Sequence, residues 1–169
     1  VTINGNTGIN GGGMLLAYSN PTLNHVIISG NTANFQGGGI MSVFSSPIFN
    51  YITISGNTAL DRAGGGIVIY AGEPMLSHVT ISGNTSYDYG GGVVINESGN
   101  PTFTHVTISE NTADSEGGGI YMGSGNLILT NSVIWDNSPE SIHSQSDDSF
   151  TQITYSDIKG GWEGEGNID

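Results

Sequence analysis

A seven-residue motif that returns at a nearly constant interval constrains the fold of this chain more than any other feature. It reads Val-Thr-Ile-Asn-Gly-Asn-Thr at its first occurrence and Val-Thr-Ile-Ser-Gly-Asn-Thr in the middle of the chain. Its copies begin at Val1, Val26, Ile52, Val79 and Val106, with a shortened copy at Val133. The interval is 25 to 27 residues. A repeat of this length indicates structural units that stack on one another.

Turn-forming residues divide the rest of each repeat. Triple glycines begin at Gly11, Gly37, Gly64, Gly90 and Gly117, and prolines follow at Pro21, Pro47, Pro74 and Pro101. The segments between them are short and β-prone, and none shows the period of an amphipathic helix. We therefore predict an all-β fold, a right-handed parallel β-helix (solenoid) of about six coils with three short strands per coil. We expect regular coils over residues 1–138 and an irregular final coil and tail over 139–169. Because Val1 opens within a repeat, we also expect a longer parent chain.

One asparagine recurs at the same turn position in every repeat. The column consists of Asn6, Asn31, Asn57, Asn84, Asn111 and Asn137. Stacked side-chain amides can satisfy both one another and the backbone groups of a buried turn. We interpret the column as a structural asparagine ladder. The triple glycines are interpreted in the same way, as positions that need a positive φ or a close approach to the next coil.

The segment from Pro101 to Tyr121 carries a resemblance to a known family. It reads P-T-F-T-H-V-T-I-S-E-N-T-A-D-S-E-G-G-G-I-Y and resembles the right-handed β-helix repeats of bacterial secreted and cell-surface proteins, including the polymorphic outer-membrane protein type. The tail from Tyr155 to Asp169 resembles the segment that closes such arrays. The resemblance implies a secreted or cell-surface location. It does not select a function, because these arrays occur in adhesins, stalks and polysaccharide-active enzymes alike.

Charge excludes one class of partner. Fifteen acidic residues face only Arg62 and Lys159, which gives a formal net charge of -13. Nucleic-acid binders neutralise phosphates with lysine and arginine, so we expect no nucleic-acid partner. No apolar run approaches the roughly 20 residues of a membrane span, and we expect no membrane insertion of this segment.

Candidate sites for chemistry are few. Acidic residues precede the triple glycines at Asp61, Asp88, Asp114 and Glu116. They are interpreted as solvated turn carboxylates, with weak calcium binding as the alternative, and no other cofactor is expected. His25, His78 and His105 share one register with Tyr51, and we interpret them as rings packed at a bend rather than as a metal or catalytic site. We predict no catalytic residues.

Strand alternation points to an apolar stripe on the outer surface. The stripe consists of Leu15, Met41, Val68, Val94 and Tyr121. Exposed stripes of this length mark contacts with another protein, another domain or a second copy. Two alternatives stay open: a long loop covers the stripe, or the alternation is shifted by one residue. A second outward array, of Thr and Ser in the motif, resembles ice-binding surfaces.

We therefore expect a non-enzymatic structural or adhesive repeat module of a secreted or surface protein. Its expected partners are itself, through lateral or end-to-end association into filaments, another surface protein, or a glycan. The alternative function is a polysaccharide-binding or polysaccharide-cleaving β-helix, and a minor alternative is an ice-binding surface. An enzyme of this kind should break the repeat symmetry at its site, and the first five coils show no such break.

Overall fold

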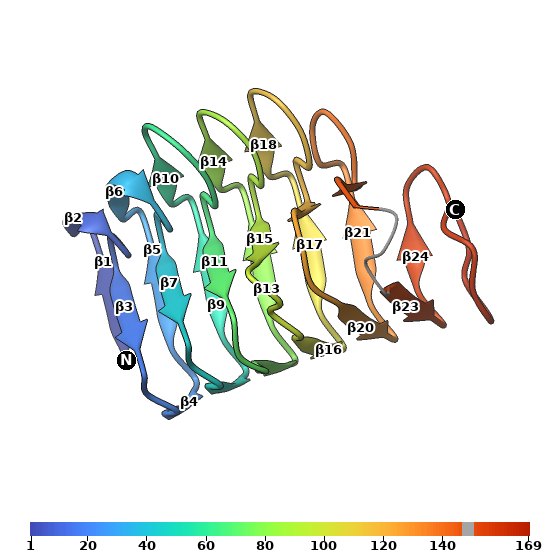
Figure 1. Ribbon diagram of the computed structural model, residues 1–169, viewed down its shortest axis with the longest axis horizontal. Coiled ribbons are helices and arrows are strands. Elements are labelled where there is room, and N and C mark those ends of the chain that lie inside the picture. Colours follow the sequence, from blue (N-terminus) through green and yellow to red (C-terminus); the bar gives the residue numbers. More distant parts are fainter. Residues whose placement is uncertain (147–150) are drawn as a thin grey trace.

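The chain forms a solenoid of parallel β-strands. The computed structural model describes residues 1–146 and 151–169, and the regular elements of these residues are all strands. Each strand pairs in parallel with the equivalent strand one coil away. Successive coils lie side by side along the long axis, from the N-terminus at one end to the C-terminus at the other (Figure 1). The predicted parallel β-helix of about six coils is confirmed.

Four sheets run along the solenoid. Sheet A consists of β1 (Thr2–Asn4), β5 (Ile27–Ser29), β9 (Thr53–Ser55), β13 (Thr80–Ser82), β17 (Thr107–Ser109), β21 (Val133–Trp135) and β24 (Asp157–Ile158). Sheet B consists of β2 (Thr7–Asn10), β6 (Thr32–Gln36), β10 (Thr58–Ala59), β14 (Thr85–Ser86) and β18 (Thr112–Ala113). Sheet C consists of β3 (Met14–Ala17), β7 (Ile40–Val43), β11 (Ile67–Tyr70), β15 (Val93–Asn96), β19 (Ile120–Met122) and β22 (Ile142–Ser144). Sheet D consists of β4 (Thr22–Asn24), β8 (Ile48–Asn50), β12 (Met75–Ser77), β16 (Thr102–Thr104), β20 (Leu127–Thr130) and β23 (Thr151–Thr154).

Sheet B adds a fourth strand to the three that were expected in each coil. Its strands directly follow the asparagine of the motif, and two residues separate each from the preceding strand of sheet A. In the sequence they merge with the preceding strand into one β-prone run. The backbone divides that run at a residue of positive φ, for example Gly30 at 60° and Gly56 at 60°. Such a conformation suits glycine and ends a strand.

The triple glycines meet both of the expected demands. The first of each set has a positive φ, as at Gly37, where φ is 69°. The second lies where neighbouring coils touch, so a Cβ on Gly38 would fall 2.5 Å from the carbonyl oxygen of Gly65. That distance is far inside van der Waals contact. A side chain there would push the two coils apart.

Inward-facing apolar side chains fill the solenoid. In sheet A the inner column includes Ile28, Ile54, Ile81 and Ile108, all fully buried. Phe49, Leu76 and Phe103 form a second inner column in sheet D. Burying a side chain of this size contributes about 1.5–3 kcal/mol, so stacked columns dominate the stability of the coil.

The predicted asparagine ladder is continuous from Asn6 to Asn137. Each Nδ2 donates to the Oδ1 of the asparagine in the next coil at 2.9 to 3.0 Å. From Asn31 onward, Nδ2 also donates to an isoleucine carbonyl of the preceding coil at 2.9 to 3.0 Å. The same Oδ1 accepts a backbone N–H, as from Asn57 to Asn84 at 2.9 Å. The ladder therefore satisfies polar groups that the buried turns would otherwise leave unpaired.

The two ends of the solenoid are built differently. In the first coil the inner residues Ile3, Met14 and Leu23 are only partly buried. At the other end the tail crosses the last coil, and Trp162 packs against the apolar core. The tail is held by backbone pairing, including a hydrogen bond from Ile158 N–H to the carbonyl of Ile168 at 3.0 Å. Across the described ranges, no helix is long and apolar enough to cross a membrane.

Candidate functional site

The outer face of sheet C carries the stripe that the sequence placed on the surface. Only Leu15 is exposed, at 54%; Met41 is 7% exposed, Val68 0%, Val94 0% and Tyr121 6%. The loops between sheets B and C cover the four buried members. A Cβ on Gly64 would lie 2.2 Å from Cγ2 of Val68, which shows how closely the loop backbone packs. The expectation of a solvent-exposed stripe is therefore wrong, and the alternative of a covering loop is correct.

The covered stripe is a second apolar cluster outside the main core. It includes Ala63 from one loop, and Val43, Tyr70 and Tyr89 pack against it. The sequence repeat predicts the strands but not the paths of the loops between them. The cover over the stripe therefore could not be predicted from the repeat. Glycines that touch the stripe, such as Gly64 and Gly90, were the available signal.

Beyond Tyr121 the same column continues into a cluster of polar and aromatic groups. Tyr121 pairs in register with His143 of β22, and the two rings stack with centroids 5.5 Å apart. Tyr89 lies against the other side of Tyr121, with centroids 4.3 Å apart. Tyr121 donates its hydroxyl hydrogen to Oε1 of Gln145 at 2.9 Å. Sequence reasoning missed His143, although extending the stripe by one coil would have found it.

Two carboxylates flank the imidazole of this cluster. Nε2 of His143 lies 3.3 Å from Oε2 of Glu116, and Nδ1 lies 3.4 Å from Oε1 of Glu140. The same Glu140 oxygen accepts the backbone N–H of Gly117 at 2.7 Å. All three side chains are partly exposed. We call Tyr121, His143, Glu116 and Glu140 the coil-six cluster.

Burial also changes the acidity of the neighbouring tyrosines. Desolvation raises the pKa of Tyr121 above its ordinary value, and the nearby Tyr89, Glu116 and Asp88 raise it further. Desolvation likewise raises the pKa of Tyr89, while Arg62 acts in the opposite direction. Both phenols therefore stay neutral to a higher pH than an ordinary tyrosine does.

The four acidic residues that precede the triple glycines differ in their contacts. Glu116 pairs with His143, and Asp88 accepts a hydrogen bond from Ser115 Oγ at 3.1 Å. Asp61 and Asp114 lie exposed on their loops. Within residues 1–146 and 151–169 no group of three or more histidine and acidic side chains is placed to hold a metal ion. Calcium binding by these residues stays an untested prediction.

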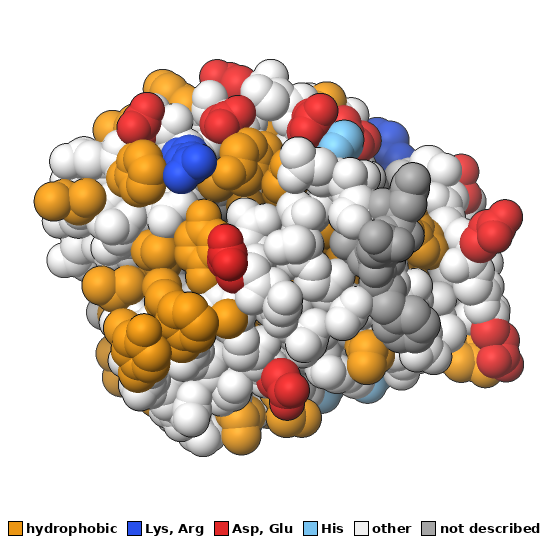
Figure 2. All heavy atoms as spheres, in the orientation of Figure 1, with side chains coloured by type: hydrophobic (Ala, Val, Ile, Leu, Met, Phe, Trp, Pro, Cys, Tyr) orange, Lys and Arg blue, Asp and Glu red, His pale blue; other side chains and the backbone are white. Residues whose placement is uncertain are grey.

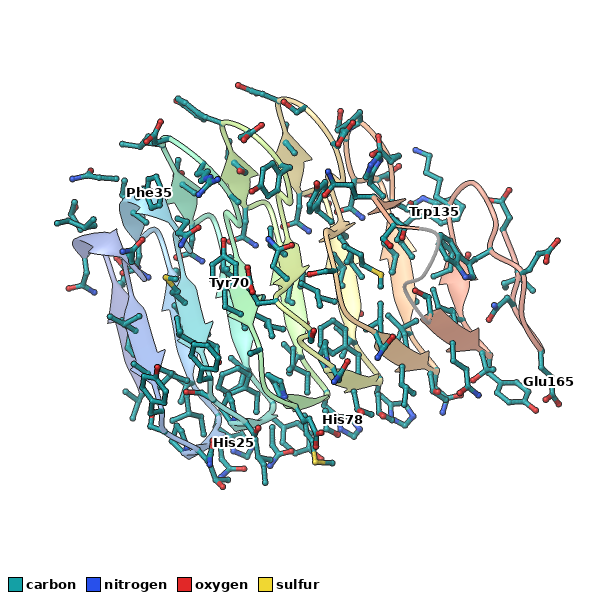
Figure 3. The ribbon with its side chains drawn as sticks, in the orientation of Figure 1. His25, Phe35, Tyr70, His78, Trp135 and Glu165 are labelled. Carbon is teal, nitrogen blue, oxygen red and sulfur yellow. The ribbon has the colours of Figure 1, made fainter. Side chains whose placement is uncertain are left out.

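A corner column of aromatic side chains lies between sheets D and A. The rings of His25, Tyr51, His78 and His105 stack in order, with centroids 5.0, 4.8 and 4.8 Å apart. Each of these residues has a φ near 55°, so the corner projects the side chain outward. Figure 3 shows His25 and His78 along one edge of the solenoid. The column continues in register through Asn131 to Tyr155.

Hydroxyl and amide side chains flank this corner column. On sheet D the outward residues next to the corner are Asn24, Asn50, Ser77, Thr104, Thr130 and Thr154. On sheet A, Thr53, Thr80 and Thr107 are in register over three coils, bounded by Ile27 and Val133. Ser77 Oγ lies 2.9 Å from Nδ1 of His78, which fixes that ring. The result is an exposed edge with a repeat of one coil.

One basic side chain and a tryptophan meet near the last coil. Lys159 Nζ donates to Oδ1 of Asp136 at 2.7 Å and lies 5.9 Å from the ring centroid of Trp135. The other, Arg62, lies over Phe35 at 5.6 Å from the ring centroid. Both cations are thus engaged by groups of the chain itself, and the exposed charge of the surface is acidic.

Comparison with known proteins returns one match. A family model described as "Right handed beta helix region" matches residues 76–164, just over half of the chain. No curated protein and no solved structure matches the chain.

Proposed function

Because the chain belongs to the right-handed β-helix family, we propose that it is a non-enzymatic structural and adhesive repeat module of a secreted or cell-surface protein. The observation that carries this proposal is the asparagine ladder. It runs unbroken through the coils and joins each one to the next. The residues that recur in every repeat therefore stabilise the rod, and we assign partner binding to side chains on its outer surface.

The corner column is the adhesive surface in this proposal. Its ring edges and the flanking hydroxyl and amide groups are exposed, and equivalent groups recur at one-coil intervals. Spacing of this kind complements a partner that has a repeat of its own, such as a glycan chain. The net charge of -13 favours a neutral glycan over an acidic one.

The structure removes one of the two modes of self-association expected from the sequence. Val68 and Val94 are buried under the chain's own loops, so lateral contact through the stripe is not part of the proposal. Pairing end to end requires exposed strand edges, and the tail covers the C-terminal coil.

Binding to immobilised neutral polysaccharides, with a depolymerisation screen on the same panel, tests the proposal. His78→Asn with His105→Asn removes two rings, and Asn131 shows that the corner accepts asparagine. We expect at least tenfold weaker binding and an unchanged fold. Asp61→Asn, on a loop away from the corner, serves as the control. Release of oligosaccharides by the wild-type chain would sink the non-enzymatic function, and full binding by the double variant would sink the adhesive corner.

The coil-six cluster favours the second candidate, a polysaccharide-cleaving β-helix. Here the repeat symmetry breaks and an imidazole lies between two carboxylates, an arrangement that can relay a proton. If the depolymerisation screen finds activity, His143→Asn and Glu116→Gln should each reduce it at least a hundredfold. Asp61→Asn should leave it unchanged. Activity that survives both cluster variants would exclude this site.

A further inference from the structure

A pocket of about 320 Å³ lies where the corner column ends. Asn131 and Tyr155 form one side of it, and they are the two members of the column after His105. Val133 and Asp157 from sheet A and Gly166 and Ile168 from the tail also line it. Replacement of a ring by the smaller Asn131 opens the space. Volumes of this size suit a small ligand.

Asp157 lines this pocket, and one of its carboxylate oxygens is closed off from solvent. That oxygen, Oδ1, has no hydrogen-bond partner among the described residues. Because a ligand cannot reach it, we assign Asp157 an effect on the pocket through its negative charge. In the adjacent outward position of the column stands Val133, which has nothing to donate.

Asn131 supplies a second polar group without a function in the fold. Its backbone N–H donates to the carbonyl of Thr154 at 3.2 Å, but its side-chain amide makes no hydrogen bond within residues 1–146 and 151–169. The ladder asparagines, in contrast, use both of their amide hydrogens. Asn131 therefore offers one acceptor and two donors to a ligand.

Tyr155 gives the pocket a fixed aromatic wall. Its hydroxyl donates to Glu165, and a Cβ on Gly166 would lie 2.4 Å from its Cδ1, so the tail backbone packs against the ring. The side chain is nevertheless 53% exposed. Glu165 lies at the far end of the solenoid, beside this wall (Figure 3). Val133 and Ile168 add apolar surface.

We propose that this pocket binds one pyranose ring of a neutral glycan. Sugar hydroxyls exchange hydrogen bonds with the amide of Asn131, while the C–H face of the ring lies against Tyr155 and Val133. Acidic sugars are disfavoured by Asp157 and by the net charge of -13. The assignment rests on the adhesive role proposed above and places the terminal contact of the bound glycan.

Saturation-transfer NMR on the whole chain tests this site. The probes are methyl glycosides of glucose, galactose, mannose and N-acetylglucosamine, with methyl glucuronide as the acidic comparison. We expect transfer to at least one neutral glycoside, and at least tenfold weaker binding of the glucuronide. Asn131→Gly should weaken binding of the neutral glycoside at least tenfold, and glycine keeps the positive φ of position 131. Asp157→Asn should reduce the difference between the neutral glycosides and the glucuronide.

Asp61→Asn, on a loop away from both the corner column and the pocket, is the control and should bind as the wild type does. Thermal melting of each variant verifies the fold. Absence of transfer to every neutral glycoside, or equal transfer to the wild type and the Asn131→Gly variant, overturns the proposal. Cleavage of the glycosides during the experiment would instead contradict the non-enzymatic function, so the two failures are distinguishable.

Discussion

The two ends of the solenoid are made from similar coils and differ in what covers them. At the first coil Ile3, Met14 and Leu23 are partly exposed, whereas their counterparts one coil inward, such as Ile28 and Phe49, are fully buried. At the last coil the tail lies across the core and adds Trp162 to it. Repetition therefore builds the interior of the rod, and sequence outside the repeat protects its end.

The stripe on the outer face of sheet C also differs between its first coil and its later coils. Leu15 is exposed, whereas Val68 is fully buried beneath the longer connection between β10 and β11. Hydrophobic side chains accordingly gather over the first coils in Figure 2. Tyr18 and Phe44 stack there with centroids 5.3 Å apart, and both are exposed.

The largest expected effect comes from removing one amide from the middle of the ladder. Asn84→Ala leaves the backbone N–H of Asn57 without its partner, and it removes one hydrogen bond each from the carbonyl of Ile54 and the amides of Asn57 and Asn111. We expect a loss of about 3–5 kcal/mol in the free energy of unfolding, since each buried unpaired group costs about 1–3 kcal/mol. Asn6→Ala, at the exposed end, should cost about 1 kcal/mol or less. Urea denaturation measures both, and equal losses would show that the ends are as tightly built as the middle.

A polar substitution under the loops should have the next largest effect. Val68→Asn places an amide where the backbone of Gly64 leaves no room for water, and we expect a loss of about 2–4 kcal/mol. Leu15→Asn changes the same column at the exposed coil and should alter stability by less than about 0.5 kcal/mol. Thermal melts of the two variants compare them directly. A stable Val68→Asn protein would mean that the loop does not cover the stripe in solution.

The tail offers a smaller test of the closed end. Trp162→Ala should cost about 2 kcal/mol, because a half-buried tryptophan loses less than the 3–5 kcal/mol of a fully buried one. Met14→Ala at the open end is the counterpart, and about 1 kcal/mol is expected. Hydrogen exchange should also speed up in β24 for the first variant alone. Exchange that is unchanged there would show that the tail does not protect the coil.

The smallest expected effect is a loss of stability at alkaline pH, caused by the buried tyrosines. Tyr121 and Tyr89 have a raised pKa in the folded state, so the unfolded chain ionises first, near the ordinary value of 10. Their contribution to stability is complete below that pH and is lost as the pH rises through the folded-state pKa. Tyr121→Phe should flatten this part of the profile, whereas Tyr18→Phe, exposed at the first coil, should not. Identical profiles for both variants would contradict the burial of Tyr121.

Periodicity explains why some features could be predicted and others could not. The asparagine ladder, the triple glycines and the inner columns repeat in register, so position in the repeat predicts the contact, as for Asn84 with Asn111. The cover over Val68, the pairing of His143 with Glu116 and the packing of Trp162 depend on loop and tail paths that occur once. The pocket beside Asp157 belongs to this second group, because it forms between the last strands and the tail.

The amide ladder can be built with any number of coils. Every interior asparagine accepts on Oδ1 from the asparagine of the preceding coil and donates one Nδ2 hydrogen to the asparagine of the next, so the two faces of a coil are complementary to those of any other coil. A coil that is duplicated or deleted as a whole unit restores the same contacts at the junction. Genetic gain or loss of whole repeats can therefore change how far such a rod reaches without redesign of its interior, while insertions of part of a repeat break the chain of amides.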